Sequence, residues 1–295
     1  MTRKPVSPLY RAIRGSIRLV YPKPTLQGLD QIPDEPVIFV GNHTQMNGPI
    51  VAELYMPVPR KTWCASAMME RSEVAAYAFQ DFWSQKPKWT HPFYRVLAHL
   101  ITPLSVLIFN QAETIPVYHD TRILETFRQT VQTLEDGKSV VIFPEEDRRY
   151  NNVVYHFQSH FTDVARTYYK KTGKVLSFVP MYIAPRLKMV VFGPPVRFDP
   201  TVPMRTQRDT ICRALMDRVT ELALALPPHT VVPYRNIPKK DYPKNVPAEV
   251  SDPWKNPSLT IASSAFPSSA TPNTGICCCF WVGLGIFYSM YSQKT

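Results

Sequence analysis

The chain has few cysteines, and their spacing indicates no disulfide framework. Of its five cysteines, only Cys64 and Cys212 lie in the body of the chain, and they are far apart. Such spacing predicts free thiols in a reducing compartment. The N-terminus also lacks the uninterrupted apolar core of a secretory signal, because arginines interrupt it every three or four residues. We therefore expect no export.

Charge is scarce overall, and acidic residues are absent from the first 24 positions. Charged residues make up 19% of the 295 residues and hydrophobic residues 44%, which predicts a folded chain with a packed core. The formal net charge is +11, and the acid-free start contains six basic residues: Arg3, Lys4, Arg11, Arg14, Arg18 and Lys23. Such a block predicts an anionic partner. Anionic lipid, nucleic acid and an acidic carrier protein share the required sign, so charge alone leaves the choice open.

Residues 1–27 form a basic amphipathic segment. Leu9, Ile13, Ile17 and Val20 recur near helical spacing, with arginines between them. This pattern suits a short helix lying flat in a lipid headgroup layer, and it equally suits an ordinary solvated surface helix. We expect an anionic membrane surface as the partner. Nucleic acid is not expected, since the basic N-terminus is the only feature that favours it.

Short apolar runs alternate with helical patterns in the middle of the chain. Residues 37–41 are continuously apolar between Pro36 and a turn, as in a strand buried on both faces. Further strands are expected at 62–67, 114–118, 139–143, 176–183 and 189–192. Helices are expected from a cap at Asp120 or Thr121 to Gly137, from about 157 to 172, and from about 206 to 226. Strand, helix and strand in succession predict parallel pairing, so we expect an α/β fold, a mostly parallel sheet covered by helices.

An aromatic insertion, residues 69–110, interrupts this alternation. Its part from 93 to 109 is apolar but shorter than the ~20 residues of a typical membrane span, and it contains Pro103. We therefore expect a pair of apolar helices in this part. Core packing, lipid contact and the wall of a channel for an apolar ligand are the roles that remain open for it.

The last 50 residues, 246–295, differ in composition from the rest. From Ser251 the chain is rich in Ser, Pro, Thr, Ala and Asn, and no charged residue lies between Lys255 and Lys294. This composition predicts a low-complexity tail, which ends in a short apolar segment rich in cysteine. A tail anchor, lipidated cysteines and an extension without function all remain open. The main folded domain is accordingly expected at 28–245.

Asn42 and His43 directly follow the first expected strand. In open α/β sheets, ligands gather at the carboxyl edge, where these residues would lie. A histidine there, close to a helix N-terminus, can stay neutral at pH 7 and accept a proton from an attacking hydroxyl. A lone histidine at such a place is more often structural, so the surrounding motifs decide its role.

Three further blocks follow in order. They are Ile115-Pro-Val-Tyr118, Phe143-Pro-Glu145 followed by arginines, and Val179-Pro180. With Asn42-His43, they resemble the four sequence blocks of the lysophosphatidate and glycerol-phosphate acyltransferase family, over about residues 28–196. The resemblance implies a glycerolipid acyltransferase-like fold, and transfer of a fatty acyl group from acyl-CoA or acyl-carrier protein to a lysophospholipid or glycerol-phosphate-like acceptor. It further implies phospholipid synthesis at the cytoplasmic face of a membrane, by a peripheral or monotopic protein without a cofactor.

The resemblance assigns roles to single residues. His43 matches the family's catalytic base, which deprotonates the acceptor hydroxyl. Glu145 and Arg148 match the glutamate and the phosphate-binding arginine of the third block, with Arg149 as a second cation. His119 stands where the second block usually has an arginine. A guanidinium fork suits phosphate geometry, so these roles are physically sound for the arginines.

The chain departs from the family pattern at three places. The family has an aspartate that orients the imidazole five residues after its histidine, but here that position is Gly48, and the neighbouring Asn47 is a candidate to accept the ring N–H instead. His119 weakens a phosphate site unless it is cationic. Glu146 and Asp147 replace Gly-Thr and bring negative charge to the site. An acceptor other than lysophosphatidate, or an inactive relative that binds lipid or acyl-CoA, therefore remains open.

His156 and His160 lie four residues apart within an expected helix. That spacing can bind zinc on one helical face. The sequence lacks the glutamate that hydrolytic sites of this pattern place directly after the first histidine, and it offers no evident third ligand. We therefore expect no metal site, and a metal hydrolase is a minor alternative.

Overall fold

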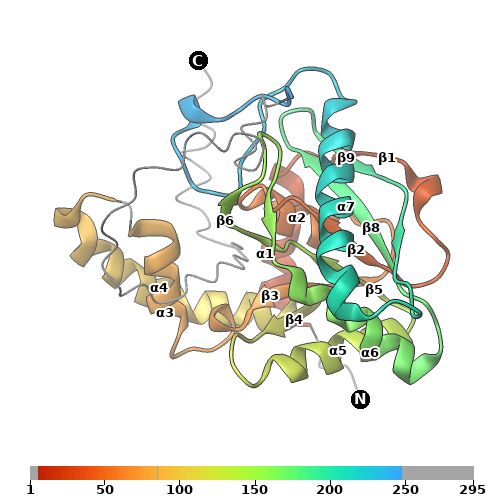
Figure 1. Ribbon diagram of the computed structural model, residues 1–295. Coiled ribbons are helices and arrows are strands. Elements are labelled where there is room, and N and C mark those ends of the chain that lie inside the picture. Colours follow the sequence, from red (N-terminus) through yellow and green to blue (C-terminus); the bar gives the residue numbers. More distant parts are fainter. Residues whose placement is uncertain (1–5, 85, 248–295) are drawn as a thin grey trace, which may run out of the picture.

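The computed structural model describes residues 6–84 and 86–247, and its centre is an eight-stranded sheet (Figure 1). The strands follow the order β1-β9-β8-β2-β5-β3-β4, and β10 pairs with β8. Their bounds are β1 Thr25–Gln27, β2 Ile38–Gly41, β3 Arg60–Ala65, β4 Thr114–Val117, β5 Ser139–Ile142, β8 Ser177–Ala184, β9 Met189–Phe192 and β10 Val196–Arg197. All six expected strands are present, shifted by at most a few residues.

Most neighbouring strands of this sheet run parallel. The pairs β2–β5, β2–β8, β3–β5, β3–β4 and β1–β9 are parallel, whereas β9 and β10 pair with β8 in the antiparallel direction. Every residue of β2, β5 and β8 is buried, which explains why these strands appear in the sequence as continuous apolar runs. The predicted α/β fold class, with a mostly parallel sheet, is confirmed.

Helices cover both faces of the sheet. On one face α5 (Ile123–Glu135), α6 (Asp163–Thr172) and α7 (Met204–Leu224) pack over the largest hydrophobic cluster. On the other face lie α1 (Pro8–Val20), α2 (Asn47–Leu54) and the end of α4 (His91–Gln111). Each large apolar side chain buried between these layers contributes about 1.5–3 kcal/mol.

A two-stranded hairpin precedes α6, where the sequence predicts the start of a helix. The strands are β6 (Glu145–Arg149) and β7 (Tyr155–Phe157), followed by a 3-10 turn at Ser159–Thr162. The predicted helix therefore begins at Asp163, not near Phe157. Pairing with β6, and the bond that the Gln158 N–H donates to the Pro144 carbonyl, hold this stretch extended. His156 and His160 consequently do not share a helical face, and that prediction is wrong.

The aromatic insertion consists of helical segments that project from the sheet at the left of Figure 1. Helix α3 (Val74–Ala78) leads through a π turn and a 3-10 turn (Lys88–Thr90) into α4. The predicted pair of helices within residues 93–109 is wrong, because α4 continues through Pro103 as one helix. Lys88–Gln111 spans 24 residues, and it is the one helix of the described residues that is long and apolar enough to cross a membrane by length and composition.

The basic N-terminal segment packs onto the domain. The expected helix is present as α1, and its Tyr10 and Ile17 are buried. Glu53 of α2 accepts a hydrogen bond from the Tyr10 hydroxyl at 2.9 Å and forms an ion pair with Arg14 at 2.9 Å. Strand β1, at the end of this segment, pairs with β9 of the main domain. The N-terminal segment and the domain expected from residue 28 therefore form one folded body. The tail from residue 248 lies outside the described residues, so the three roles considered for it remain open.

Both cysteines of the domain are buried free thiols, as predicted. Cys64 lies in β3 and Cys212 in α7. Burial raises the pKa of Cys212 to about 12, so this thiol stays protonated and unreactive at neutral pH.

Candidate active site

His43 lies in a loop that directly follows the central strand β2. Asn42 fixes the start of this loop against β8, because its side chain accepts a bond from the Ile183 N–H at 2.8 Å and donates one to the Ile183 carbonyl at 3.0 Å. After the histidine, Thr44 and Gln45 adopt left-handed conformations, with φ of 47° and 55°. Such residues cost about 1–3 kcal/mol each and cluster at functional sites. The loop is therefore held in one strained shape by its surroundings.

Glu145 is the second contact that fixes this loop. Its carboxylate accepts the backbone N–H of His43 at 2.5 Å and that of Tyr155 at 2.8 Å. The side chain is 1% exposed, and burial raises its pKa to about 7, against the two amide bonds. Both oxygens thus join the His43 loop to the β6–β7 hairpin. The prediction that Glu145 binds substrate gains no support from these contacts, which are those of a positioning residue.

Gly48 closes the loop at a point with no room for a side chain. Its N–H donates to the His43 carbonyl at 3.1 Å, and a Cβ at this position would lie 2.3 Å from that carbonyl oxygen and 3.2 Å from the Phe143 ring. An aspartate at position 48 would therefore clash with this backbone. The departure from the family pattern is built into the local geometry.

Asn47 has other partners than the imidazole. Its side-chain oxygen accepts the Tyr21 hydroxyl at 3.0 Å, and its amide nitrogen donates to the Thr44 carbonyl at 2.9 Å. Neither ring nitrogen of His43 has a hydrogen-bond partner among the described residues. The structure thus does not bring Asn47 onto the ring, contrary to the expected replacement of the missing aspartate.

The His43 ring lies in an aromatic enclosure. Phe143 and Tyr234 meet it edge to face, with centroids 5.5 Å and 5.9 Å away. The residue is 1% exposed, and burial lowers its pKa to about 3. The imidazole is consequently neutral at pH 7, with one N–H donor and one ring nitrogen whose lone pair can accept a proton.

Sequence reasoning missed the segment that covers this ring, residues 227–247, which we call the C-terminal strap. Its Arg235 carbonyl accepts a bond from the Gln45 amide at 3.1 Å, and the Arg235 guanidinium pairs with Asp147 at 3.0 Å. Asn245 anchors the far end by donating to the carbonyls of Ala223, in the last turn of α7, and Leu226, just after it. No motif marks the strap, because its position over His43 depends on these tertiary contacts.

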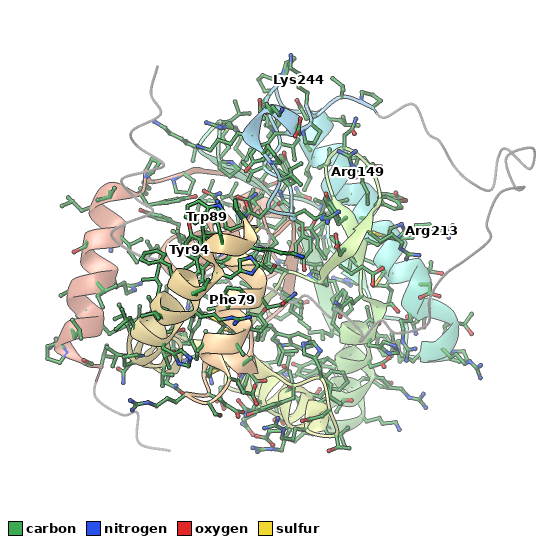
Figure 2. All side chains as sticks on the ribbon, turned by 90° about the vertical axis from the view of Figure 1, so that its left-hand side faces the viewer. Phe79, Trp89, Tyr94, Arg149, Arg213 and Lys244 are labelled. Atoms are coloured by element: carbon green, nitrogen blue, oxygen red, sulfur yellow. The ribbon has the colours of Figure 1, made fainter. Side chains whose placement is uncertain are left out.

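The two predicted phosphate ligands differ in their surroundings. Arg148 is 68% exposed and pairs with Glu146 at 3.2 Å. Arg149, which is labelled in Figure 2, lies opposite Tyr155 in the hairpin register. Burial raises the pKa of Tyr155, and the charges of Arg149 and Arg235 act against that rise. The Tyr155 ring lies 5.6 Å from Tyr234, so the charges of Arg149 and Arg235 act on a ring next to the His43 enclosure.

His119 belongs to a different part of the edge. It lines a pocket of about 230 Å³, together with Trp63, Val117, Tyr118, Asp120, Ile123, Phe127, Ile142, Pro144, Gln158, His160 and Phe161. This pocket opens on the α5 face, whereas Phe143 and the His43 ring lie on the α2 face. Three strand spacings separate β2 from β4, which corresponds to ~14 Å. Burial lowers the pKa of His119, and the charge of Asp120 offsets only part of this effect. The lowered pKa disfavours the cationic form that a phosphate ligand needs.

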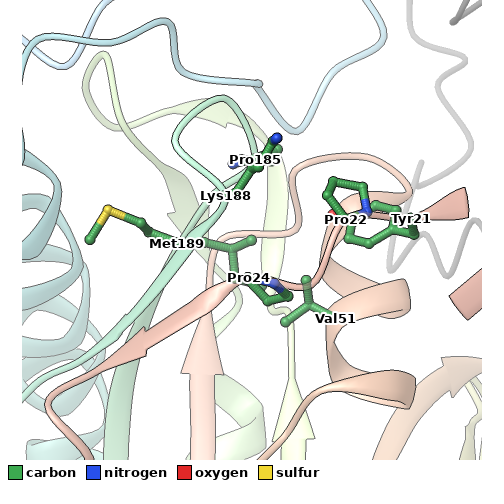
Figure 3. A pocket seen from close by; sticks show the side chains of 8 residues that line it. Tyr21, Pro22, Pro24, Val51, Pro185, Lys188 and Met189 are labelled. Carbon is green, nitrogen blue, oxygen red and sulfur yellow. The ribbon is translucent and has the colours of Figure 1, made fainter. Parts of the chain in front are cut away.

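A second pocket is too small for a substrate. It lies between residues Tyr21 to Pro24 and the start of β9 (Figure 3), and its volume of about 10 Å³ takes at most about one water. Within residues 6–84 and 86–247, no group of three His, Cys, Asp or Glu side chains is placed to hold a metal ion. The strained loop, and the ring nitrogens that are unpaired among the described residues, make His43 the candidate catalytic centre.

Comparison with known proteins gives a distant structural likeness. The chain matches no protein-family model and no curated protein. Among solved structures it is similar to the 1-acyl-sn-glycerophosphate (LPA) acyltransferase PlsC from Thermotoga maritima, with 14% identity and a TM-score of 0.44. The match covers 74% of this chain and 81% of that chain. The functional conclusion therefore rests on the site itself.

Proposed function

We propose that the chain is an O-acyltransferase of glycerolipid metabolism. It would move a fatty acyl group from acyl-CoA or acyl-carrier protein to a hydroxyl of a lysophospholipid or glycerol-phosphate-like acceptor. The observation that carries this proposal is His43, a neutral imidazole fixed at the carboxyl edge of the sheet, with both ring nitrogens unpaired among the described residues. Its place in the four sequence blocks adds independent support.

The reaction needs one proton acceptor. A ring nitrogen of His43 takes the proton of the acceptor hydroxyl while the hydroxyl oxygen attacks the thioester carbon. The new C–O bond forms, the C–S bond breaks, and the imidazolium returns its proton to the leaving thiolate. General-base catalysis of this kind contributes about 10²- to 10⁴-fold. Because burial disfavours the imidazolium and Gly48 leaves no carboxylate beside it, we expect a gain at the lower end of this range.

The surrounding residues have distinct tasks in this proposal. Glu145, Asn42 and Gly48 hold the loop, and Arg149 with Arg235 offers two guanidinium groups for an acceptor phosphate. Tyr234 covers the His43 ring, so the acceptor hydroxyl reaches the ring only when Tyr234 moves. Direct substrate contacts by Arg148 and His119 remain predictions. We propose that the reaction takes place at the cytoplasmic face of a membrane, and the exposed basic residues of α1 support this location.

A second candidate is a relative that binds acyl-CoA or lipid without turnover. The observation that favours it is the same ring, because no group among the described residues orients or stabilises a protonated His43. Such a protein would retain the fold and ligand affinity and lack the reaction.

One experiment separates the two candidates. The purified full chain is incubated with labelled acyl-CoA or acyl-carrier protein and a panel of lysophospholipids and glycerol phosphate, and products are identified by mass. The acyltransferase proposal predicts a new ester together with free thiol from at least one donor and acceptor pair. Binding of labelled acyl-CoA without an ester from any pair would support the second candidate instead.

A further inference from the structure

One face of α4 carries large apolar side chains that no part of the described chain covers. Four residues, 61% to 83% exposed, form this face, which we call the α4 stripe: Trp89, Phe93, Val96 and Leu100. They are four, three and four positions apart, so they lie on one side of the helix and of the turn that starts it. Figure 2 looks onto this insertion, with Trp89 labelled at its surface. Exposed apolar groups concentrated in this way mark an interaction surface.

The buried residues of α4 show that the stripe is not part of the hydrophobic core. The buried residues of the helix are Ala98, Thr102, Ser105, Ile108 and Phe109. Ala98 follows Trp89 by nine residues, or two and a half helical turns, so the two side chains lie about 180° apart around the helix axis. The helix thus buries one face against the domain and turns the opposite face outward. Only 28% of its most apolar window is buried, unlike a core helix.

The segment that carries the stripe has charges of a single sign. From residue 82 to 112 the sequence contains no acidic residue, and its charged residues are Lys86, Lys88 and Arg95. All three are exposed, and the Arg95 guanidinium lies 5.3 Å from the centre of the Phe79 ring. Arg11 and Arg18 of α1 are also exposed, on a helix that packs against Ile108 and Phe109 of α4. The apolar stripe is therefore flanked by positive charge.

We propose that the α4 stripe docks on the surface of an anionic lipid bilayer, with the axis of α4 in the membrane plane. Basic side chains beside an apolar face complement anionic headgroups, and tryptophan is favoured at the membrane interface. The inner face of α4 is held against the protein from its first turn, because the His91 ring meets Phe79 edge to face and Tyr94 stacks on Trp83. Only the outer face of the helix is available to lipid, so docking on the surface fits and crossing the hydrocarbon core does not.

The test uses the full chain and vesicles of phosphatidylcholine, alone or mixed with phosphatidylglycerol. The triple variant Trp89→Gln, Phe93→Gln, Leu100→Gln removes the stripe without touching buried positions. Its matched control is Leu124→Gln, on α5 and 71% exposed. We expect wild type and control to sediment with the anionic vesicles, and the triple variant to bind at least about 100-fold more weakly, from the apolar area lost.

A second measurement reports whether the α4 stripe itself enters the bilayer, because another segment could also bind the chain to vesicles. Vesicles with brominated acyl chains quench tryptophans that enter the bilayer. We expect quenching in the wild type that Trp89→Phe largely removes. Equal quenching in that variant, together with unchanged binding of the triple variant, would overturn the proposal. So would a dimer that forms without lipid and is lost in the triple variant. Neither assay contains an acyl donor or acceptor, so their failure is distinct from failure of the acyltransferase proposal.

Discussion

His43 and His119 follow parallel strands of the same sheet edge, and their environments differ almost completely. His43 is enclosed by Phe143 and Tyr234, and its loop is fixed by backbone bonds from three sides. His119 lines a pocket on the opposite face, beside the acidic Asp120. Burial lowers the pKa of both rings, to about 3 for His43. Two histidines at the same edge of a sheet therefore belong to different sites when their side chains lie on opposite faces of that sheet.

The difference gives the two histidines different chemical prospects. A neutral ring in a fixed loop suits proton transfer, which depends on geometry to a fraction of an ångström. A partly exposed ring in an apolar pocket suits packing against a ligand. We therefore assign the reaction to the β2 end of the edge, and we expect changes there to have larger effects than changes at the β4 end.

The largest effect is expected for Gly48→Asp, which installs the aspartate of the family pattern. The new Cβ would clash with the His43 carbonyl, so we expect a loss of about 4 kcal/mol in the free energy of unfolding, without a gain in activity. Urea unfolding measures the loss. Gly15→Asp is the control, because a Cβ at Gly15 meets nothing within 4 Å. A stable and more active Gly48→Asp protein would show that the loop adapts and that its geometry is not fixed.

A smaller effect with a defined pH dependence is expected for Glu145→Gln. The amide cannot accept both backbone N–H groups, so the variant should lose about 2 kcal/mol at pH 4.5. The pKa of Glu145 is raised in the folded state to about 7, so its stabilising effect is complete below pH 4.5 and is lost as the pH rises through 7. The penalty of the variant should therefore shrink between pH 4.5 and pH 8 in unfolding experiments. Glu146→Gln, outside the core, is the control, and a penalty that grows with pH would contradict the assignment.

Arg149→Gln should next separate the two arginines of the hairpin. Removing a guanidinium that binds the acceptor phosphate costs about 1.5–3 kcal/mol, so we expect the KM for a phosphate-bearing acceptor to rise about 10- to 100-fold. Arg148→Gln is the matched control and should change KM less than about threefold, since the side chain is exposed and paired with Glu146. Steady-state kinetics with one acceptor measure both. A larger rise in KM for Arg148→Gln than for Arg149→Gln would assign the acceptor phosphate to Arg148, as the family pattern implies.

The smallest effect is expected for His119→Gln. Its distance from His43 and its lowered pKa predict a change in turnover and in acceptor KM below about threefold. The same kinetic assay tests this. A loss as large as that of Arg149→Gln would mean that the two ends of the edge act on one substrate, and it would remove the distinction drawn between them.

Much of the fold could be predicted because its signals are local. Buried strands such as β2 and β5 appear as continuous apolar runs, and Gly137 and Gly173 end helices where φ turns positive, at 76° and 71°. The hairpin was not predictable in this way. Its first strand has the sequence Glu-Glu-Asp-Arg-Arg, without apolar alternation, and it is held by the long-range bonds of Glu145.

The candidate site was predictable only in part. The position of His43 after a strand, and its neutral state, follow from sequence. The absence of a hydrogen-bond partner for its ring does not, because it depends on the Asn47 side chain turning to Tyr21 and on the close approach of Gly48 to the His43 carbonyl. Tyr234 and Arg235 come from a segment about 190 positions away in sequence, and only the folded chain brings them to the His43 ring and its loop.

The most direct test of the account compares acyl transfer by the wild type and His43→Gln at pH 7. The donor and acceptor pair is one found to give product, and circular dichroism and thermal unfolding confirm that the variant is folded. If His43 is the proton acceptor, the rate of ester formation should fall at least about 100-fold, while acyl-CoA binding stays within about threefold. A folded His43→Gln protein that transfers acyl groups at the wild-type rate would contradict the central claim.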